Sequence, residues 1–100
     1  MIQYVLSFNI VPGKGKEFWN FMQEKGIPFW KKFDQVKSVD IFTTLGGETL
    51  YEAYFDMPSY TTFDEISKDP DFEPVSVEFL SLTQDLRRKF LMEERQLVMH

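Results

Sequence analysis

The sequence predicts an α+β fold in which four strands and two helical regions follow the order β-α-β-β-α-β. Three segments alternate apolar and other residues with the period of a strand: 2–11, 36–45 and 49–57. The residues after the first and third of these segments change to a helical period. At 100 residues with 43% hydrophobic content, the chain suits one domain, residues 1–100, with a core of its own.

The first strand is predicted from the complete alternation of residues 2–11. One face is entirely apolar and the other is mixed; the apolar face consists of Ile2, Tyr4, Leu6, Phe8 and Ile10. Pro12 and Gly13 end the strand, because proline donates no ladder hydrogen bond and glycine permits the turn. Gly13 to Lys16 lacks the spacing of a phosphate-binding loop, so we interpret it as a turn.

A helical region is predicted over residues 15–33. Its apolar stripe holds Phe18, Phe21, Met22, Phe29 and Phe33. Pro28, in the sequence Gly26-Ile27-Pro28, removes a backbone donor, so we expect a kink there or a new helix with proline in its first turn.

The two middle strands, 36–45 and 49–57, are predicted to form a hairpin that Gly46 and Gly47 connect tightly. A second helical region follows, with Ser59 as its N-cap. Asp69-Pro70 interrupts this region, and a further helix is expected from Pro70 to Leu82. Residues 86–98 suit either a helix or a strand; we expect a strand, because the preceding order leaves a place for a fourth.

This order is that of a ferredoxin-like fold, an antiparallel sheet with its helices on one face. The helices can cover the apolar face of the first strand. The opposite face is too apolar to be left to solvent; its apolar residues are Val5, Val11, Phe42, Leu50 and Tyr54. We therefore expect a homodimer in which this face meets its own copy, pairing two chains into an α+β barrel.

Composition excludes several kinds of chemistry. The chain has no cysteine and one histidine, His100, which argues against a metal site and against thiol or triad catalysis. Its net charge of −5 is concentrated in an acidic middle, so nucleic acid is not an expected partner. No apolar run is long enough to span a membrane and the N-terminus lacks the form of a signal peptide, so we expect a cytoplasmic protein.

Two stretches resemble the dimeric α+β barrel superfamily, including its uncharacterised and antibiotic-biosynthesis-monooxygenase-like members. The first is Phe8-Asn9-Ile10-Val11-Pro12-Gly13-Lys14-Gly15-Lys16-Glu17-Phe18, and the second is Glu52-Ala53-Tyr54-Phe55-Asp56-Met57-Pro58-Ser59-Tyr60 followed by Asp69-Pro70-Asp71-Phe72. The resemblance implies sheets packed back to back in a dimer and, in many members, a small-molecule pocket between helices and sheet. Members include cofactor-free monooxygenases acting on polyketide quinols, haem-degrading enzymes, cyclases and isomerases.

The resemblance carries no catalytic residue over to this chain. Haem-degrading members use an asparagine in the first strand and a histidine in the second half. Here Asn9 lies on the mixed face and the one histidine is His100, so a haem role is disfavoured. We expect no cofactor and no metal.

The candidate ligand-pocket residues are aromatic: Tyr4, Phe8, Phe18, Phe21, Trp30, Tyr51 and Phe63. They suit a flat apolar ligand, and a buried tyrosine hydroxyl could donate a proton to it. The alternative is that these side chains simply fill the core, which is the usual role of aromatic residues at helical spacing. Two charged motifs, Asp69 to Glu73 and Arg87-Arg88-Lys89, could bind a cation or an anion, but solvated acids and a solvated or inter-subunit edge are favoured instead.

The sequence thus favours a homodimer that binds a small apolar or aromatic metabolite. If it is an enzyme, a cofactor-free monooxygenase or isomerase is the expected class, since the substrate can supply the electrons and the protein the orientation and desolvation. The alternative is a non-catalytic module for ligand sensing or assembly.

Overall fold

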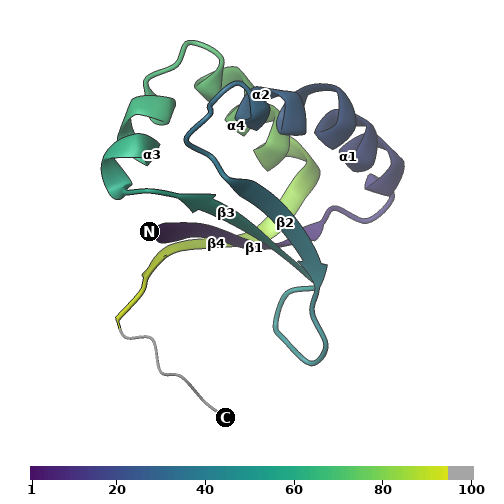
Figure 1. Ribbon diagram of the computed structural model, residues 1–100. Coiled ribbons are helices and arrows are strands. Elements are labelled where there is room, and N and C mark those ends of the chain that lie inside the picture. Colours follow the sequence, from purple (N-terminus) through teal and green to yellow (C-terminus); the bar gives the residue numbers. More distant parts are fainter. Residues whose placement is uncertain (95–100) are drawn as a thin grey trace.

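The computed structural model describes residues 1–94 and has the predicted β-α-β-β-α-β order (Figure 1). The strands are β1 Ile2–Ile10, β2 Ser38–Thr43, β3 Tyr51–Met57 and β4 Thr83–Met92. The helical elements are α1 Gly15–Phe21, the π-helical turn η1 Met22–Gly26, α2 Ile27–Lys31, α3 Tyr60–Ser67 and α4 Phe72–Leu82. None of the helices in residues 1–94 is long and apolar enough to cross a membrane.

The four strands form one antiparallel sheet in the order β2-β3-β1-β4. Tyr4 of β1 lies opposite Phe55 of β3 and opposite Phe90 of β4, and residues directly opposite each other share a face. The apolar residues of β1 therefore lie on one face with those of its neighbours. In Figure 1 the helices of the described chain all lie on this side of the sheet, as predicted for a ferredoxin-like fold.

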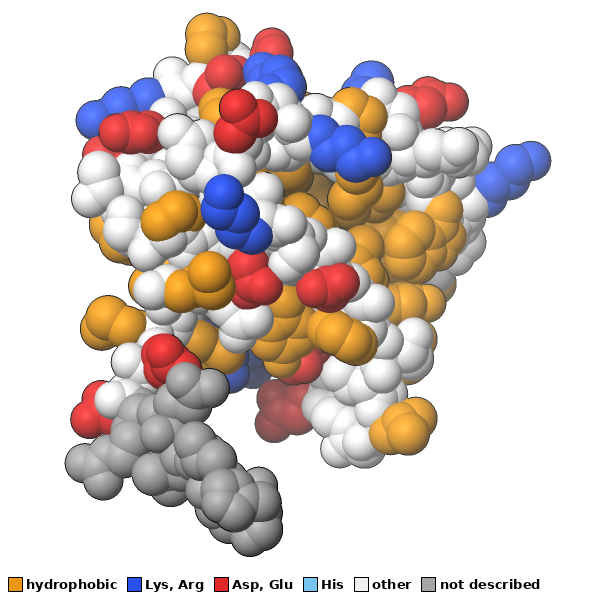
Figure 2. Space-filling view, in the orientation of Figure 1, with side chains coloured by type: hydrophobic (Ala, Val, Ile, Leu, Met, Phe, Trp, Pro, Cys, Tyr) orange, Lys and Arg blue, Asp and Glu red, His pale blue; other side chains and the backbone are white. Residues whose placement is uncertain are grey.

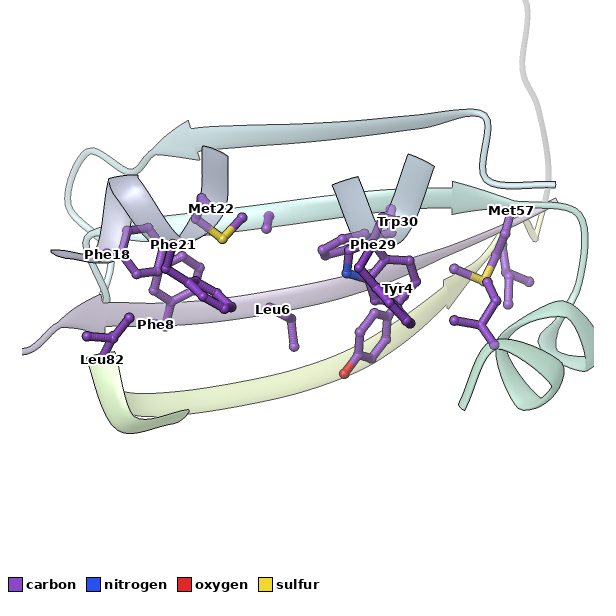
Figure 3. Packing of buried hydrophobic residues seen from close by; sticks show 14 residues of the cluster. Tyr4, Leu6, Phe8, Phe18, Phe21, Met22, Phe29, Trp30, Met57 and Leu82 are labelled. Atoms are coloured by element: carbon purple, nitrogen blue, oxygen red, sulfur yellow. The ribbon is translucent and has the colours of Figure 1, made fainter. Parts of the chain in front are cut away.

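The core lies between the helices and the sheet. Figure 3 shows side chains of β1, among them Tyr4, Leu6 and Phe8, pointing into the same layer as Phe18, Phe21 and Trp30 of the helices. Phe8 and Phe18 are fully buried, with ring centroids 5.5 Å apart. Burying several such side chains is the main favourable contribution to folding of a chain this short.

The interruption predicted near Pro28 is confirmed, and it takes the form of a π-helical turn. The N–H of Ile27 bonds to the carbonyl of Met22, an i to i+5 bond, and Pro28 lies in the first turn of α2. Proline fits there because it has no N–H to donate, and the regular α-helical hydrogen bonding is interrupted directly before it.

The tight Gly-Gly connection predicted between β2 and β3 is wrong. Residues 44–50 form a longer loop, in which the N–H of Thr44 bonds to the carbonyl of Leu50 at 2.7 Å. Gly46 takes a positive φ of 83°, where glycine is favoured. The loop is also held from outside the hairpin, since Asn9 Oδ1 of β1 accepts a 2.7 Å hydrogen bond from Leu50 N–H.

The last segment is a strand, as expected, but β4 begins at Thr83, directly after α4. Its pairing with β1 shifts register between Ser7 and Asn9, where Asp85 takes a positive φ of 58°. This is a β-bulge, in which one strand carries an extra residue. The predicted strand continued to residue 98; residues 95–98 lie outside the described part.

Candidate functional site

A cavity of about 360 Å³ lies between the helices and the sheet. Its floor is formed by strand residues: Tyr4, Leu6, Phe8, Ala53, Phe55, Leu86 and Arg88. Its walls come from two helical segments that face each other: Phe21, Met22, Gly26 and Trp30 on one side, and Phe72, Val75, Ser76, Phe79 and Leu80 of α4 on the other. Figure 2 shows one face of the molecule, where hydrophobic side chains gather below the helical layer around a hollow and most charged side chains lie around them.

Tyr4, Phe8, Phe21 and Trp30, four of the seven candidate pocket residues, line this cavity. The other three lie outside its lining. Phe18 is fully buried against Phe8, and Tyr51 stacks on the Phe8 ring with centroids 5.8 Å apart. Phe63 packs against Tyr4, 4.6 Å away. These three rings are neighbours of lining residues and support them.

The polar groups of the lining side chains are few: the Tyr4 and Ser76 hydroxyls, the Arg88 guanidinium and the Trp30 indole N–H. Burial raises the pKa of the Tyr4 phenol above 10.0, and the positive charge of the neighbouring Arg88 acts in the opposite direction. The phenol is therefore protonated at neutral pH and available as a hydrogen-bond donor.

Arg88 lines the cavity, whereas the motif Arg87-Arg88-Lys89 predicts a solvated or inter-subunit edge. Arg88 lies opposite Leu6, on the helix-covered face, whereas Arg87 and Lys89 lie opposite Ser7 and Val5 on the other face. The alternation of Leu86, Arg88 and Phe90 along β4 was a signal for this placement. Neither a carboxylate nor a histidine is found among the described residues that line the cavity.

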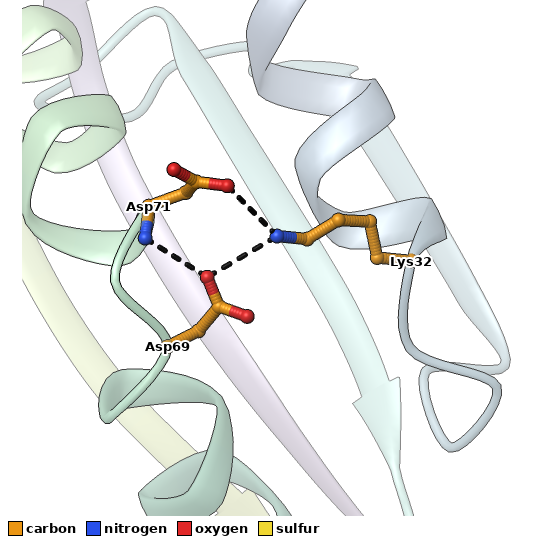
Figure 4. Close-up of polar contacts among 3 residues, drawn as sticks. All are labelled: Lys32, Asp69 and Asp71. Carbon is orange, nitrogen blue, oxygen red and sulfur yellow. Dashed lines mark hydrogen bonds and ion pairs between the residues drawn. The ribbon is translucent and has the colours of Figure 1, made fainter.

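The acidic motif Asp69 to Glu73 binds a lysine of the chain itself (Figure 4). Lys32 Nζ donates to Asp69 Oδ1 and to Asp71 Oδ2, each at 3.1 Å. The contact joins the end of α2 to the connection between α3 and α4. Lys25 Nζ and Glu78 Oε1, 3.0 Å apart, join η1 to α4 in the same manner. Both contacts hold together the two helical walls of the cavity.

These contacts predict a pH dependence for Asp69. The N–H of Asp71, 2.9 Å from Asp69 Oδ1, and then Lys32 lower the pKa of the Asp69 carboxyl below 3.8. Because the carboxyl has a lower pKa in the folded state than in the unfolded state, its charge stabilises the fold at pH values above the unfolded-state pKa. This stabilisation is lost as the pH falls through the folded-state pKa. We expect Asp69→Asn to be less stable than the wild type at neutral pH, with the difference closing below about pH 4 in urea denaturation. A difference that stays constant with pH would contradict the assignment.

The face of the sheet opposite the helices carries the residues predicted for dimerisation. Phe42 is 53% exposed and its ring centroid lies 5.5 Å from that of Tyr54, which is half-buried. Leu50 is exposed and Val11 is half-buried, each beside the end of a strand. Val5 lies at the centre of this face but is fully buried, so it presents no surface of its own to a partner.

Polar pairs surround this apolar group. Asp56 accepts hydrogen bonds from Gln3 at 2.7 Å and from Ser38 at 2.8 Å. The Tyr54 hydroxyl donates to Glu52 at 2.9 Å, and this hydrogen bond raises the pKa of Tyr54. The face therefore combines exposed apolar surface with polar side chains that already have partners.

The fold and the cavity define a class: ferredoxin-like α+β proteins with an apolar cavity between helices and sheet. SnoaB, a cofactor-independent oxygenase from Streptomyces nogalater, matches with a TM-score of 0.79 and 12% identity over 96% of this chain and 95% of that one. HapK from Hahella chejuensis matches with 0.79 and 10% identity over 100% and 99%. A dabb family protein with a ferredoxin-like fold from Mesorhizobium loti matches with 0.75 and 6% identity over 92% and 95%.

At these identities the likeness concerns the fold alone, and it confirms the predicted ferredoxin-like arrangement of strands and helices. The sequence matches no family model and no curated protein.

Proposed function

We propose that the protein is a homodimer that binds a small aromatic metabolite in the cavity between its helices and its sheet. The observation that carries this proposal is the cavity itself, about 360 Å³ in volume, with apolar walls and a tyrosine hydroxyl beside an arginine. Small-molecule sites are typically apolar hollows of about 300–1,000 Å³ with a few directed polar groups.

The volume and the polar groups indicate the kind of ligand. A cavity of about 150 Å³ holds benzene, so this one has room for about two fused rings. Arg88 can pair with an anionic oxygen of the ligand, such as a phenolate, an enolate or a carboxylate. Tyr4, protonated at neutral pH, can donate a hydrogen bond to the same oxygen. We therefore expect an aromatic ligand with one acidic group.

If the protein is an enzyme, we propose that it is a cofactor-free oxygenase. Its likeness in fold to SnoaB, a cofactor-independent oxygenase, supports this proposal. In such a reaction an activated methylene and O₂ give a carbonyl and water, and all the electrons come from the substrate. Because the described lining offers no carboxylate or histidine as a base, the substrate would lose its acidic proton to water. Arg88 would stabilise the resulting anion, and the apolar walls would hold it close to O₂.

The lack of a base in the described lining also favours a second candidate, a non-catalytic ligand-sensing module. The same cavity and the same Arg88 would then serve binding alone. Oxygen uptake separates the two candidates: an oxygenase consumes O₂ when given 2-tetralone, a two-ring compound with an activated methylene, and a sensing module binds 2-tetralone without consuming O₂.

Replacing Arg88 tests the ligand class. We expect Arg88→Met to weaken 2-naphthoate binding by roughly 10- to 100-fold, the effect of losing a hydrogen bond to a charged group. Binding of neutral 2-methoxynaphthalene should not change, because the apolar walls remain. Fluorescence titration measures both affinities. Lys89→Gln is the matched control, since Lys89 is the next residue along β4 and lies on the opposite face; equal losses in the two variants would contradict the proposal.

A further inference from the structure

We infer that the π-helical turn η1 determines the size of the ligand that the cavity accepts, with Gly26 controlling the position of Met22. The inference rests on the proposed binding function and concerns the same cavity. Met22 and Gly26 are the first and last residues of η1, and both line the cavity. Both are also buried, and Figure 3 shows the Met22 side chain above the sheet in the core layer.

A π-helical turn contains one more residue than an α-helical turn, and such turns occur frequently at functional sites. Here the first and last residues of the π-helical turn lie in the wall of the cavity, within an otherwise α-helical segment that runs from α1 to α2. The turn changes the direction of the side chains that follow it relative to those that precede it. The wall therefore has a local irregularity at the place where it contacts the cavity.

The backbone at position 26 does not require glycine. Gly26 has a φ of −63°, an ordinary helical value that alanine adopts readily. Alanine also has the higher helix propensity of the two residues. The conformation of the helix therefore does not account for a glycine here.

The lack of space beside position 26 does account for the glycine. A Cβ at this position would lie 2.9 Å from Met22 Sδ, closer than nonbonded atoms pack, and 3.5 Å from both Met22 Cε and Phe21 Cε2. The thioether of Met22 thus occupies the space that a larger residue would need. Without a side chain at position 26, Met22 can lie against the helix.

An alanine at position 26 would move the end of Met22. The side chain of methionine is flexible and changes rotamer easily, so the movement costs little. The ring of Phe21 occupies one flank, whereas the cavity offers free volume beside Met22. The displaced thioether would enter the cavity and reduce the volume available to a ligand.

Three probes of increasing size test the inference: benzoate, 2-naphthoate and 2-anthroate, with one, two and three rings. We expect Gly26→Ala to weaken 2-naphthoate binding by roughly tenfold or more, the effect of a misplaced methylene-sized group in an apolar pocket, and to change benzoate binding by less than about twofold. The midpoint of thermal unfolding should not fall. Gly15→Ala is the matched control, because a Cβ at Gly15 meets no atom within 4 Å.

A double-mutant cycle identifies the route of the effect. Met22→Ala should improve 2-anthroate binding, and in that background Gly26→Ala should no longer affect 2-naphthoate. If Met22→Ala does not fold, Met22→Leu, which keeps a buried apolar side chain without the flexible tip, takes its place in the cycle.

The outcomes separate this inference from the proposed function. Unchanged 2-naphthoate affinity in Gly26→Ala, or an equal loss with and without Met22, overturns the inference and leaves the binding function standing. A wild-type protein that binds none of the three probes overturns the proposed function, and the inference with it.

Discussion

Replacing Phe18 by alanine is expected to lower the free energy of unfolding by about 3–5 kcal/mol, the usual cost of removing a large buried aromatic side chain. Phe18 is fully buried and comes from α1. Its ring centroid lies 5.5 Å from that of Phe8 in β1 and 5.9 Å from that of Phe79 in α4. The ring thus joins the sheet to both helical walls, and the cavity left behind would lie between three elements that can close only partly.

Urea denaturation measures this loss, and Trp19→Ala is the neighbouring control. Trp19 is 42% exposed and contacts Phe18 and Tyr51 edge to face, so its replacement should cost about 1 kcal/mol. Equal losses in the two variants would show that Phe18 is not the core residue described. Because Phe18 lies outside the cavity lining, its variant also separates a supporting role from direct ligand contact.

The fold could be predicted from the sequence because its strongest signals are local. The alternation of Ile2, Tyr4, Leu6, Phe8 and Ile10 determines which face of β1 is buried without reference to any other element. Pro28 interrupts a helix wherever that helix lies in the fold. The order of elements then leaves a small number of arrangements, of which the ferredoxin-like one covers the apolar face.

The errors come from contacts between distant residues. Gly46-Gly47 has the composition of a tight turn, but the bond from Leu50 N–H to Asn9 holds a longer loop across 41 positions of sequence. The bulge at Asp85 depends on how β4 follows α4 and pairs with β1, and no residue pattern within β4 specifies it. The π-helical turn η1 could not be predicted either, because a π-helical turn and a kinked α-helix have the same apolar stripe in the sequence.

The same distinction applies to the candidate site. Tyr4, Phe8, Phe21 and Trp30 could be associated with a pocket because aromatic residues on facing elements meet in a small fold. Phe18, Tyr51 and Phe63 are aromatic too but pack behind the lining. Whether an aromatic residue lines the cavity or supports the lining depends on the strand register and the helix positions, which the sequence pattern does not specify. Arg88 has a weaker signal, its alternation with Leu86 and Phe90 along β4, and Gly26 has none, because its role depends on the position of Met22.

The proposed homodimer predicts that Phe42→Asp raises the dimer dissociation constant by about 100-fold or more, as for a residue at the centre of an interface. Phe42 is 53% exposed on the sheet face that carries no helix in residues 1–94, and it contacts Tyr54. A second copy packed on this face would cover both rings. The introduced carboxylate would lie in the interface directly opposite Glu52 of β3 and two residues from Asp40 on the same face of β2, and burying like charges together is costly.

Light scattering and sedimentation equilibrium at micromolar concentration measure the effect, with the wild type expected at twice the mass of one chain. Val77→Asp is the control, because Val77 is similarly exposed, at 57%, but lies on α4, on the opposite side of the sheet. Both variants should keep the wild-type circular dichroism spectrum, since both side chains are largely in solvent in the single chain. A wild-type protein that is monomeric at micromolar concentration would contradict the dimer proposal. A dimer that persists in Phe42→Asp would show that the interface lies on another surface.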